Sequence, residues 1–394
     1  MRLPDWRNAP LQGKAVLLRV DYNVPVESGT VTNDFRLRMT IPTLTELRLA
    51  GARIVVMSHL GRPKGRRKAE HSLEPVAEAL GKLLERPVQF VDDVCGERAR
   101  AEVDRLGRGE ILCLQNLRFE PGEEKNDADF ARRLAALGDI YVNDAFGTLH
   151  RKHASVCAIT RFLPSYAGPL ILRETEVLFR VRTEPELPFV AIFGGAKVAD
   201  KIALVNQFVE TADVVLVGGA MAYTFLAANG VSIGDSLCEA ERFDDIRRTM
   251  ARARQSNHVL ALPEDHVAIR KSSRSASPQV FEGGIPAGHL GMDIGPKTAD
   301  RYASLIRGAK TVLWNGPMGV FERERFSAGT AAVARAIGRL HAYTVLCGGD
   351  TIAAVERYGN IDRFSYVSTG GGAALQFLQN PRLPGIKALL EVSD

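Results

Sequence analysis

The second half of the chain contains four apolar stretches that each run into a glycine turn: FVAIFGG at 189–195, DVVLVGG at 213–219, TVLWNGP at 311–317 and YTVLCGG at 343–349. Valine, isoleucine and leucine dominate them without a polar alternation, which is typical of parallel strands that are buried on both faces. HVLALPE at 258–264 and FSYVSTGG at 364–371 extend the series, and most of the stretches lead into helical patterning. The pattern predicts a doubly wound parallel α/β sheet.

The first half repeats the same alternation with its own set of strands, AVLLRV at 15–20, ARIVVMS at 52–58, EILCLQN at 110–116 and DIYVNDA at 139–145. The fold class is therefore α/β, with two doubly wound, Rossmann-like parallel-sheet domains. A helical pattern bracketed by prolines and a glycine separates the two sets of strands and predicts an interdomain helix. We expect an N-terminal domain over 1–168, the helix over 169–187, a C-terminal domain over 188–380, and a tail, 381–394, that docks on the N-terminal domain.

Composition excludes several classes of protein. The 394 residues carry a net charge of only +5 and 25% charged residues, without interleaved aromatics, which argues against a nucleic-acid-binding protein. The five cysteines are scattered and never form a Cys-x-x-Cys pair, so neither a disulfide framework nor a zinc site is indicated. The N-terminus lacks a signal-like apolar segment, and no run of about 18 apolar residues occurs. We expect a cytoplasmic protein without a membrane partner.

The glycine turns predict phosphate binding, because glycine lets backbone N–H groups approach an anion and a helix start carries partial positive charge. Lys197 and Lys201 follow the first turn, and on a helix beginning there both ammonium groups would project from one face. Asp350 and Thr351 follow a later turn and form an oxygen pair suited to Mg²⁺ on phosphates, although a simple helix cap is an equal reading. Neither a P-loop nor a clear dinucleotide fingerprint follows any strand.

The first half places polar and basic side chains just beyond its predicted strands, where ligands of open α/β sheets collect. Arginine matches the geometry of carboxylates and phosphates, and gathering several arginines at one edge is costly unless an anion neutralises them. The set comprises Asp21, Asn23, Arg36, His59, Arg62, Arg118 and Arg151. Its shared position predicts an anion site in the first half.

Three other functions are weaker on sequence grounds. His150 and His153 lack further ligands at useful spacing for zinc. An NAD-dependent dehydrogenase would need a glycine fingerprint after the first strand, where this chain has Asp21 and Asn23. A two-lobed binding protein for anionic metabolites shares the arginines but does not need Lys197, Glu322 and Asp350 on the other lobe.

Eight strings, taken together and in order, resemble the phosphoglycerate kinase family over nearly the whole chain. The strings are RVDYNVP at 19, SHLGRP at 58, LQNLRF at 114, DAFGTLHR at 144, GGAKVADKI at 194, WNGPMGVFE at 314, GGDT at 348 and STGGGA at 368. The resemblance implies a monomeric kinase of glycolysis that transfers the acyl phosphoryl group of 1,3-bisphosphoglycerate to ADP, giving ATP and 3-phosphoglycerate, by domain closure. Mg²⁺ would accompany the nucleotide.

The resemblance also implies roles for individual residues. The substrate-binding set is Asp21, Tyr22, Asn23, Arg36, His59, Leu60, Gly61, Arg62, Arg118 and Arg151. The nucleotide-binding set is Lys201, Gly291, Glu322, Gly348, Gly349, Asp350 and Thr351, with Asp350 at the metal. The set around the transferred phosphoryl group is Arg36, Lys197, Gly371 and Gly372.

The chain departs from the family's usual residues at four positions: Tyr22 for Phe, Leu149 for Ala, Cys347 for Gly and Gln376 for Glu. None of these removes a contact from a charged residue of the predicted sites. Cys347 adds a side chain beside the turn at 348–351, so we expect an effect on nucleotide affinity there.

Overall fold

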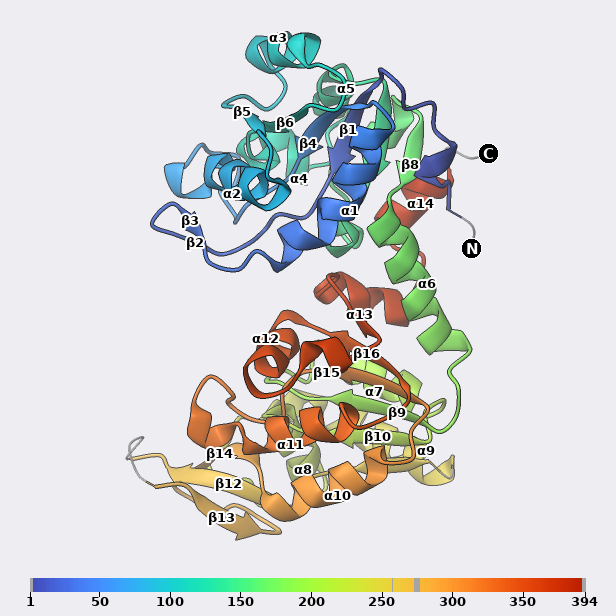
Figure 1. The fold of residues 1–394 in the computed structure, drawn as a ribbon. Coiled ribbons are helices and arrows are strands. Elements are labelled where there is room, and N and C mark those ends of the chain that lie inside the picture. The colour runs from blue at the N-terminus through green and yellow to red at the C-terminus, as the bar shows by residue number, and fades with distance from the viewer. Residues whose placement is uncertain (1–2, 257, 273–276, 392–394) are drawn as a thin grey trace. The chain divides into compact units, whose positions relative to one another are not determined.

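The computed structural model describes residues 3–256, 258–272 and 277–391. The chain divides into two units, the first made of Met1–Glu176 with Asn380–Asp394 and the second of Val177–Gln379. Figure 1 shows the helices and strands of each unit. The units are described separately below.

Six strands of the first unit form one sheet in the order β5-β6-β4-β1-β7-β8. All neighbouring pairs are parallel, so the carboxyl ends of the strands lie at one edge. Because the chain moves outward from β1 through β4 and returns to β7, the strand order reverses between β1 and β7. The strands are β1 (Ala15–Arg19), β4 (Arg53–Met57), β5 (Gln89–Val91), β6 (Ile111–Leu114), β7 (Ile140–Asn143) and β8 (Ser165–Ala167), and a hairpin adds β2 (Val26–Glu27) and β3 (Thr30–Val31).

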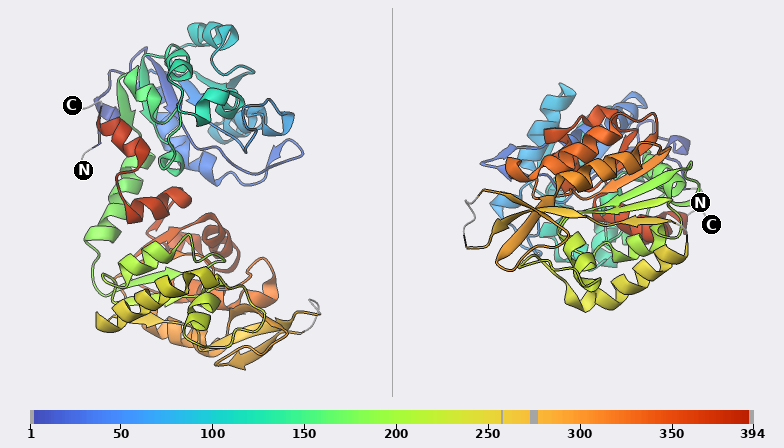
Figure 2. Two further views of the ribbon diagram at one scale, coloured as in Figure 1. Left: turned by 180° about the vertical axis from the view of Figure 1, so that it is seen from behind. Right: turned by 90° about the horizontal axis from the view of Figure 1, so that it is seen from below.

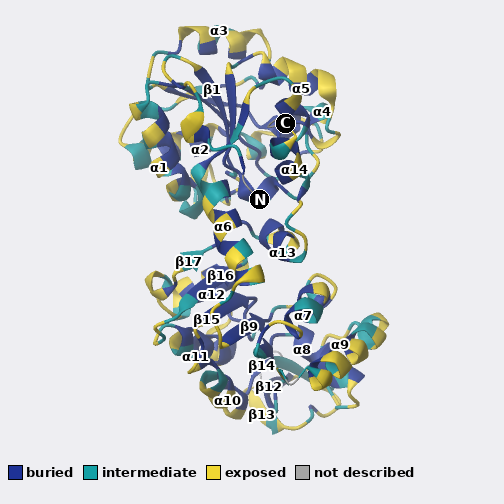
Figure 3. Cartoon of the chain, turned by 90° about the vertical axis from the view of Figure 1, so that its right-hand side faces the viewer, coloured by how far each residue is buried: buried dark blue, intermediate teal, exposed yellow. Residues whose placement is uncertain are grey.

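Helices bury both faces of this sheet, which is why its strands read as continuous apolar runs. Val16 and Leu18 of β1 pack in one cluster with residues of α1 and α2, while the intervening Leu17 is also fully buried. Figure 3 shows the buried strands and the exposed outer faces of the helices. The helices are α1 (Phe35–Leu49), α2 (Glu74–Leu84), α3 (Glu97–Arg105), α4 (Pro121–Glu124) and α5 (Ala128–Ala135), with 3-10 turns η1 (Trp6–Asn8), η2 (Ala69–His71), η3 (Leu117–Phe119), η4 (Phe146–Thr148) and η5 (Ala158–Arg161).

Helix α6 (Pro169–Thr183) begins in the first unit and ends in the second. Its start is held by Asp144, whose Oδ1 accepts the N–H of Leu170 at 2.7 Å. The helix ends four residues before the predicted 187, because a residue that precedes a proline avoids the helical conformation and Pro185 and Pro188 follow.

The end of the chain returns to the first unit as α14 (Pro384–Leu390), which contacts β8 and η5. The N–H of Gly385 donates to the carbonyl of Leu149 at 2.9 Å. A Cβ at Gly385 would lie 2.6 Å from Cδ2 of Leu149, so the glycine lets the terminal helix pack closely on this side chain. Leu149, one of the four departures, thus packs beneath the terminal helix.

The second unit contains a parallel sheet in the order β11-β10-β9-β15-β16-β17. Its strand order reverses between β9 and β15, the place where open α/β sheets bind ligands. The strands are β9 (Phe189–Phe193), β10 (Val214–Val217), β11 (Val259–Ala261), β15 (Thr311–Asn315), β16 (Tyr343–Cys347) and β17 (Tyr366–Val367). The helices are α7 (Ile202–Phe208), α8 (Met221–Ala228), α9 (Phe243–Gln255), α10 (Pro296–Ile306), α11 (Ala328–Ile337), α12 (Gly349–Tyr358) and α13 (Gly372–Gln379), with η6 (Ala240–Arg242), η7 (Glu324–Phe326) and η8 (Ile361–Arg363).

A second, antiparallel sheet in this unit was not predicted. It has the order β13-β12-β14 and is drawn in yellow and orange in Figure 2. Its strands are β12 (Asp265–Arg270), β13 (Gln279–Glu282) and β14 (His289–Ile294). The first two of these segments mix charged and apolar residues and the third contains a glycine, so they lack the continuous apolar signal of the buried parallel strands. The prediction of two doubly wound parallel-sheet domains is otherwise confirmed.

Candidate active site

The carboxyl ends of β1, β4, β6 and β7 bring most of the predicted polar residues to one edge of the first sheet. We call this group the anion cluster. It consists of Asp21, Asn23, Arg36, His59, Gly61, Arg62, Arg118 and Arg151. Arg36 reaches it from the first turn of α1.

Direct hydrogen bonds join the part of the anion cluster that follows β1 and β4. Nη1 of Arg36 donates to Oδ2 of Asp21 at 2.6 Å. Oδ1 of Asn23 accepts the N–H of Gly61 at 2.8 Å, and Nδ1 of His59 lies 3.9 Å from Oδ1 of Asp21. These contacts hold the loop at 58–62 against the loop at 20–23.

Arg118 is the most deeply buried arginine among the predicted residues, with 4% of its surface exposed. Its Nη1 donates to the carbonyl of Gly61 at 2.6 Å, and its Nε lies 3.2 Å from Oε1 of Glu124. That approach does not have hydrogen-bond geometry, so the buried Nε–H has no hydrogen-bond partner among the described residues. Burial, followed by the charge of Arg151, lowers the pKa of Arg118 to about 10.

Charges of neighbouring residues shift the pKa values of the other members of the anion cluster. Burial holds the pKa of His59 well below its usual value, and the charges of Arg118, Arg151 and Arg36 lower it further. Burial also lowers the pKa of Arg151, and the neighbouring charge of Arg62 acts in the same direction. Excess positive charge at this edge makes a bound anion favourable.

Tyr22 and Leu60, both predicted to bind substrate, turn their side chains into the core. Tyr22 is fully buried and its hydroxyl lies 2.7 Å from Oγ1 of Thr40, while Leu60 is 4% exposed. Burial raises the pKa of the Tyr22 hydroxyl. Only the backbone atoms of these two residues are available for the predicted role.

Three basic residues of this region were missed as members of the site. Arg19, the last residue of β1, is fully buried, and its Nη2 lies 3.3 Å from Nδ1 of His59. His150 lies beside Arg151, whose Nε donates to its Nε2 at 3.2 Å. Burial lowers the pKa of His153 to about 3, with Arg118 and Arg19 adding to the effect. An arginine inside an otherwise apolar strand was the available signal for Arg19.

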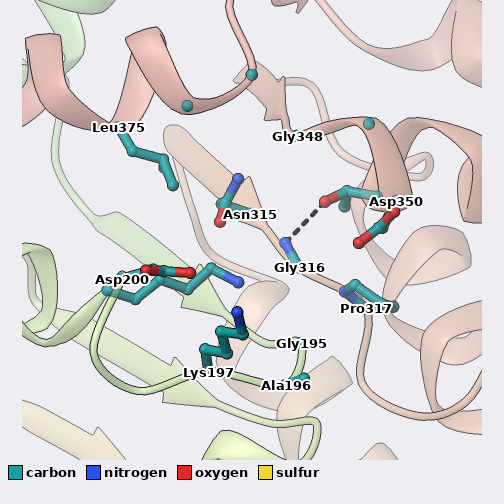
Figure 4. A pocket seen from close by; sticks show the side chains of 15 residues that line it. Gly195, Ala196, Lys197, Asp200, Asn315, Gly316, Pro317, Gly348, Asp350 and Leu375 are labelled. Atoms are coloured by element: carbon teal, nitrogen blue, oxygen red, sulfur yellow. Dashed lines mark hydrogen bonds between the residues drawn. The ribbon is translucent and has the colours of Figure 1, made fainter. Parts of the chain in front are cut away.

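The second unit contains an open cavity of about 350 Å³ at the reversal point between β9 and β15. Figure 4 shows it, with the side chain of Lys197 directed into it. We call it the glycine pocket. Its lining residues are Gly195, Ala196, Lys197, Asp200, Lys201, Asn315, Gly316, Pro317, Gly348, Gly349, Asp350, Thr351, Gly371, Gly372 and Leu375.

Lys197 and Lys201 both line the pocket, but the predicted helix that carries them is wrong. Helix α7 begins only at Ile202, and the preceding segment is an irregular loop. The carboxylate of Glu239 accepts the N–H groups of Val198 and Ala199 at 2.8 and 3.0 Å, which satisfies these donors outside a helix. Nζ of Lys201 donates to the carbonyl of Gly194 at 2.5 Å.

Burial lowers the pKa of Lys201, while the charges of Asp350 and Asp200 act in the opposite direction. The two carboxylates favour the ammonium form of Lys201, and burial opposes it.

Two helices start at the pocket wall. Gly348 precedes α12 with φ +92°, and a Cβ there would lie 2.6 Å from Nδ2 of Asn315. Helix α13 begins at Gly372, after Gly371 with φ +50°. Residues of both starts line the pocket, and the first N–H groups of a helix have no partner within the helix, which suits an anion site.

The carboxylate of Asp350 is exposed at the start of α12, whereas the hydroxyl of Thr351 is buried and accepts the N–H of Gly316 at 2.7 Å. Thr351 therefore supports the turn rather than forming an open oxygen pair with Asp350. Within the described residues, no group of three or more His, Cys, Asp or Glu could hold a metal ion. A single carboxylate suits Mg²⁺, which keeps its waters and binds the phosphates of a nucleotide.

Gly291 and Glu322 do not line the glycine pocket. Gly291 lies in β14, where a Cβ would lie 2.2 Å from the hydroxyl oxygen of Tyr223. Glu322 lies after the Gly316 turn, and its carbonyl accepts Nη1 of Arg357 at 3.2 Å. The two segments are linked near these residues, because the N–H of Val320, two positions before Glu322, donates to the carbonyl of Met292, which follows Gly291, at 2.9 Å.

The pocket adds residues that sequence reasoning missed, of which Asn315 is the most informative. Its Nδ2 donates to the carbonyl of Cys347 at 2.9 Å, while its buried Oδ1 has no partner among the described residues. The side chain of Cys347 is fully buried and is absent from the lining. The side chain of Cys347 therefore does not line the pocket, whereas its carbonyl binds Asn315, which does.

Known proteins resemble this chain along its whole length. The family model described as phosphoglycerate kinase matches residues 6–380. The phosphoglycerate kinase of Moorella thermoacetica is 47% identical over 386 residues, which is 98% of each chain. That of Thermus thermophilus is 48% identical over 381 residues, covering 96% of this chain and 97% of the relative.

Solved structures agree with the sequence comparison. The phosphoglycerate kinase of Coxiella burnetii superimposes with a TM-score of 0.88 at 39% identity and full coverage of both chains. That of Pyrococcus horikoshii gives 0.87 at 32% identity and 99% coverage of each chain. Because the family model, the relatives and the structures agree, the chain belongs to the phosphoglycerate kinase family and is a phosphotransferase of the glycolytic reaction that links 1,3-bisphosphoglycerate and ADP to 3-phosphoglycerate and ATP.

Proposed function

We propose that the anion cluster binds 3-phosphoglycerate and the acyl phosphate formed from it, and that the glycine pocket binds ADP and ATP. The observation that carries the first assignment is the buried Nε–H of Arg118, which makes no hydrogen bond and lies within a group of arginines. A buried donor without an acceptor costs free energy. A phosphate or carboxylate oxygen would supply that acceptor and neutralise the cluster.

The nucleotide assignment is supported by the two helix starts and two lysines that face the glycine pocket. We expect Lys201, Gly348, Gly349, Asp350 and Thr351 to hold the phosphates, with Thr351 acting through the turn that it supports. Gly291 and Glu322 lie outside this pocket, so we assign them to the nucleoside end of the ligand. Asp350 would hold Mg²⁺, which supplies charge neutralisation on the nucleotide phosphates.

The chemistry requires no general base. An α-carboxyl group titrates at roughly 3.3–3.7, so the attacking carboxylate of 3-phosphoglycerate is already ionised at neutral pH. His59, whose pKa lies well below its usual value, is neutral at that pH and donates hydrogen bonds rather than removing protons. The protein then contributes positioning and charge stabilisation.

We assign that stabilisation to Arg36, Lys197 and the N–H groups of Gly371 and Gly372. Because the proposed sites belong to different units, the phosphoryl group can pass only after the units close on each other and exclude water. Helix α6 belongs to both units and is the proposed hinge. The proposed domain boundaries stay at 1–168, 169–187 and 188–380, with the tail 381–394 on the first domain.

Among the described residues, no helix combines the length and the apolar character that a membrane span needs. We propose a cytoplasmic monomer whose partners are the two small-molecule substrates, without a nucleic-acid or membrane partner. Size-exclusion chromatography with light scattering would test the oligomeric state. A mass near 43.0 kDa is the expected result, and twice that mass would overturn it.

A coupled assay of ATP-dependent phosphorylation of 3-phosphoglycerate tests the function. We expect turnover that saturates in both substrates and that is lost when EDTA removes Mg²⁺. An absence of turnover at millimolar substrate would favour a binding protein for anionic metabolites. Unchanged turnover in EDTA would remove the metal from the proposal.

A further inference from the structure

Arg19 is a fully buried arginine at the floor of the anion cluster, and its charge needs compensation. Its Nη1 donates to the carbonyl of Val20, its Nη2 lies 3.3 Å from Nδ1 of His59, and its Nε donates to Oγ of Ser155 at 3.0 Å. No carboxylate of the described residues forms a direct ion pair with it. The negative charge that is connected to Arg19 most directly lies beyond Ser155 in the hydrogen-bond network.

That charge is Glu123, whose fully buried side chain lies in the short helix α4, which follows β6 and η3. Its Oε1 accepts the hydroxyl of Ser155 at 2.6 Å, and its Oε2 accepts the N–H of Ser155 at 2.9 Å. His153 lies 3.7 Å from the same carboxylate, but its lowered pKa leaves it neutral at neutral pH. The carboxylate of Glu123 is therefore connected to the guanidinium of Arg19 through the hydroxyl of Ser155.

The chemistry of the groups sets the direction of every hydrogen bond in this network of Glu123, Ser155, Arg19 and His59. A guanidinium only donates and a carboxylate only accepts, so the single hydroxyl hydrogen of Ser155 points to Glu123 and its lone pair faces Arg19. For the same reason Nδ1 of His59 must accept from Arg19. The ring proton of neutral His59 then lies on Nε2, which becomes a hydrogen-bond donor.

We propose that Glu123 and Ser155 are positioning residues for the phosphoglycerate site. Through Arg19 they hold His59 as a neutral hydrogen-bond donor, and they keep both side chains in place for binding of the anion. Neither residue belongs to the anion cluster itself. The inference rests on the proposed role of that cluster. A buried network of this kind acts as a unit, so losing one member should affect the others.

The test compares Glu123→Gln, Ser155→Ala and the double variant in steady-state kinetics with 3-phosphoglycerate and MgATP. A glutamine leaves the hydroxyl hydrogen or the N–H of Ser155 facing an amide hydrogen and removes the charge. We expect the KM for 3-phosphoglycerate to rise about tenfold in each single variant. The KM for MgATP should stay within twofold, and the double variant should be no worse than the worse single variant.

Glu120→Gln is the matched control, because Glu120 lies directly before α4, three positions from Glu123, but pairs with Arg133 at 3.4 Å. It should keep the parent KM for both substrates. Thermal unfolding measures the folded fraction of each variant. If Glu123→Gln does not fold, Ser155→Ala decides alone, since it removes the link and leaves the carboxylate in place.

Arg118→Ala separates failure of this inference from failure of the site assignment. If Arg118→Ala raises the KM for 3-phosphoglycerate while folded Ser155→Ala and Glu123→Gln keep the parent value and lose only stability, the positioning role is overturned and the two residues are structural. If Arg118→Ala also leaves that KM unchanged, the anion cluster does not bind 3-phosphoglycerate. Independent, additive effects of the two single changes would likewise contradict a relay.

Discussion

Replacing Arg36 by alanine should slow the chemical step and leave the fold intact. Arg36 occupies the first turn of α1, and its Nη1 lies 2.6 Å from Oδ2 of Asp21 with 29% of the side chain exposed. An ion pair at this level of exposure contributes about 1 kcal/mol or less to stability. The variant should therefore remain folded at 25 °C.

The catalytic loss should be much larger than the loss of stability. Removing an arginine that stabilises a transferring phosphoryl group costs about 10³-fold in kcat. At 1.36 kcal/mol for each factor of ten, that loss corresponds to roughly 4 kcal/mol of transition-state stabilisation. Because Arg36 also belongs to the anion cluster, the KM for 3-phosphoglycerate should rise as well, and the loss of kcat at saturating substrate isolates its role at the transferred phosphoryl group.

Arg38→Ala is the matched control, because Arg38 lies one half-turn along the same helix and pairs with Asp34 at 2.7 Å, with 61% of its side chain exposed. Steady-state kinetics of both variants at saturating substrates, together with circular dichroism, make the comparison. The control should keep the parent kcat. A kcat of folded Arg36→Ala within tenfold of the parent would refute the role of Arg36.

Three further predictions concern the turns and the buried ionisable groups. Gly348→Ala places a Cβ 2.6 Å from Nδ2 of Asn315 at a residue with φ +92°. It should lower the free energy of unfolding, measured by urea denaturation, by about 1–3 kcal/mol and raise the KM for ADP. Gly349→Ala is the control, because nothing lies within 4 Å of its Cβ, and it should keep the free energy of unfolding near the parent value. Burial raises the pKa of Asp144 to about 6, so the folded state holds a proton that the unfolded chain loses near pH 4. The free energy of unfolding therefore falls as the pH rises from about 4 to 6. Asp144→Asn should gain stability relative to the parent by more at pH 7 than at pH 4.5, and an equal difference at the two pH values would contradict this prediction. Because His59 is neutral above its lowered pKa, kcat/KM for 3-phosphoglycerate should show no histidine ionisation between pH 6 and 8. A step in that range that disappears in His59→Gln would exclude a neutral His59.

The parallel sheets could be predicted from the sequence because their signal is local. Each strand is a short run of apolar residues, such as Phe189–Phe193, whose five residues are all buried. The polar residues beyond the strands follow from topology, because parallel strands put their carboxyl ends at one edge. The position of Asp21 and Arg118 at this edge was predicted in this way, whereas Arg36 reaches it from the first turn of α1.

The features that were missed depend on contacts between distant residues. The loop that carries Lys197 is kept out of helix by Glu239, about 40 positions further along the chain. Arg19 is stabilised by Ser155, which is separated from it by 136 positions, so an isolated reading of β1 does not explain a buried charge there. The sheet of β12, β13 and β14 is only partly buried, and its segments carry no continuous apolar pattern.

The assignment of one substrate to each unit is tested most directly by titration calorimetry on two variants. Arg118→Ala should weaken binding of 3-phosphoglycerate by about 30-fold, because a buried charge-assisted hydrogen bond is worth roughly 2 kcal/mol, while leaving ADP binding within twofold of the parent. Lys201→Ala should weaken ADP and leave 3-phosphoglycerate unchanged. If either variant weakens both ligands equally, or the wrong one, the division between anion cluster and glycine pocket is contradicted.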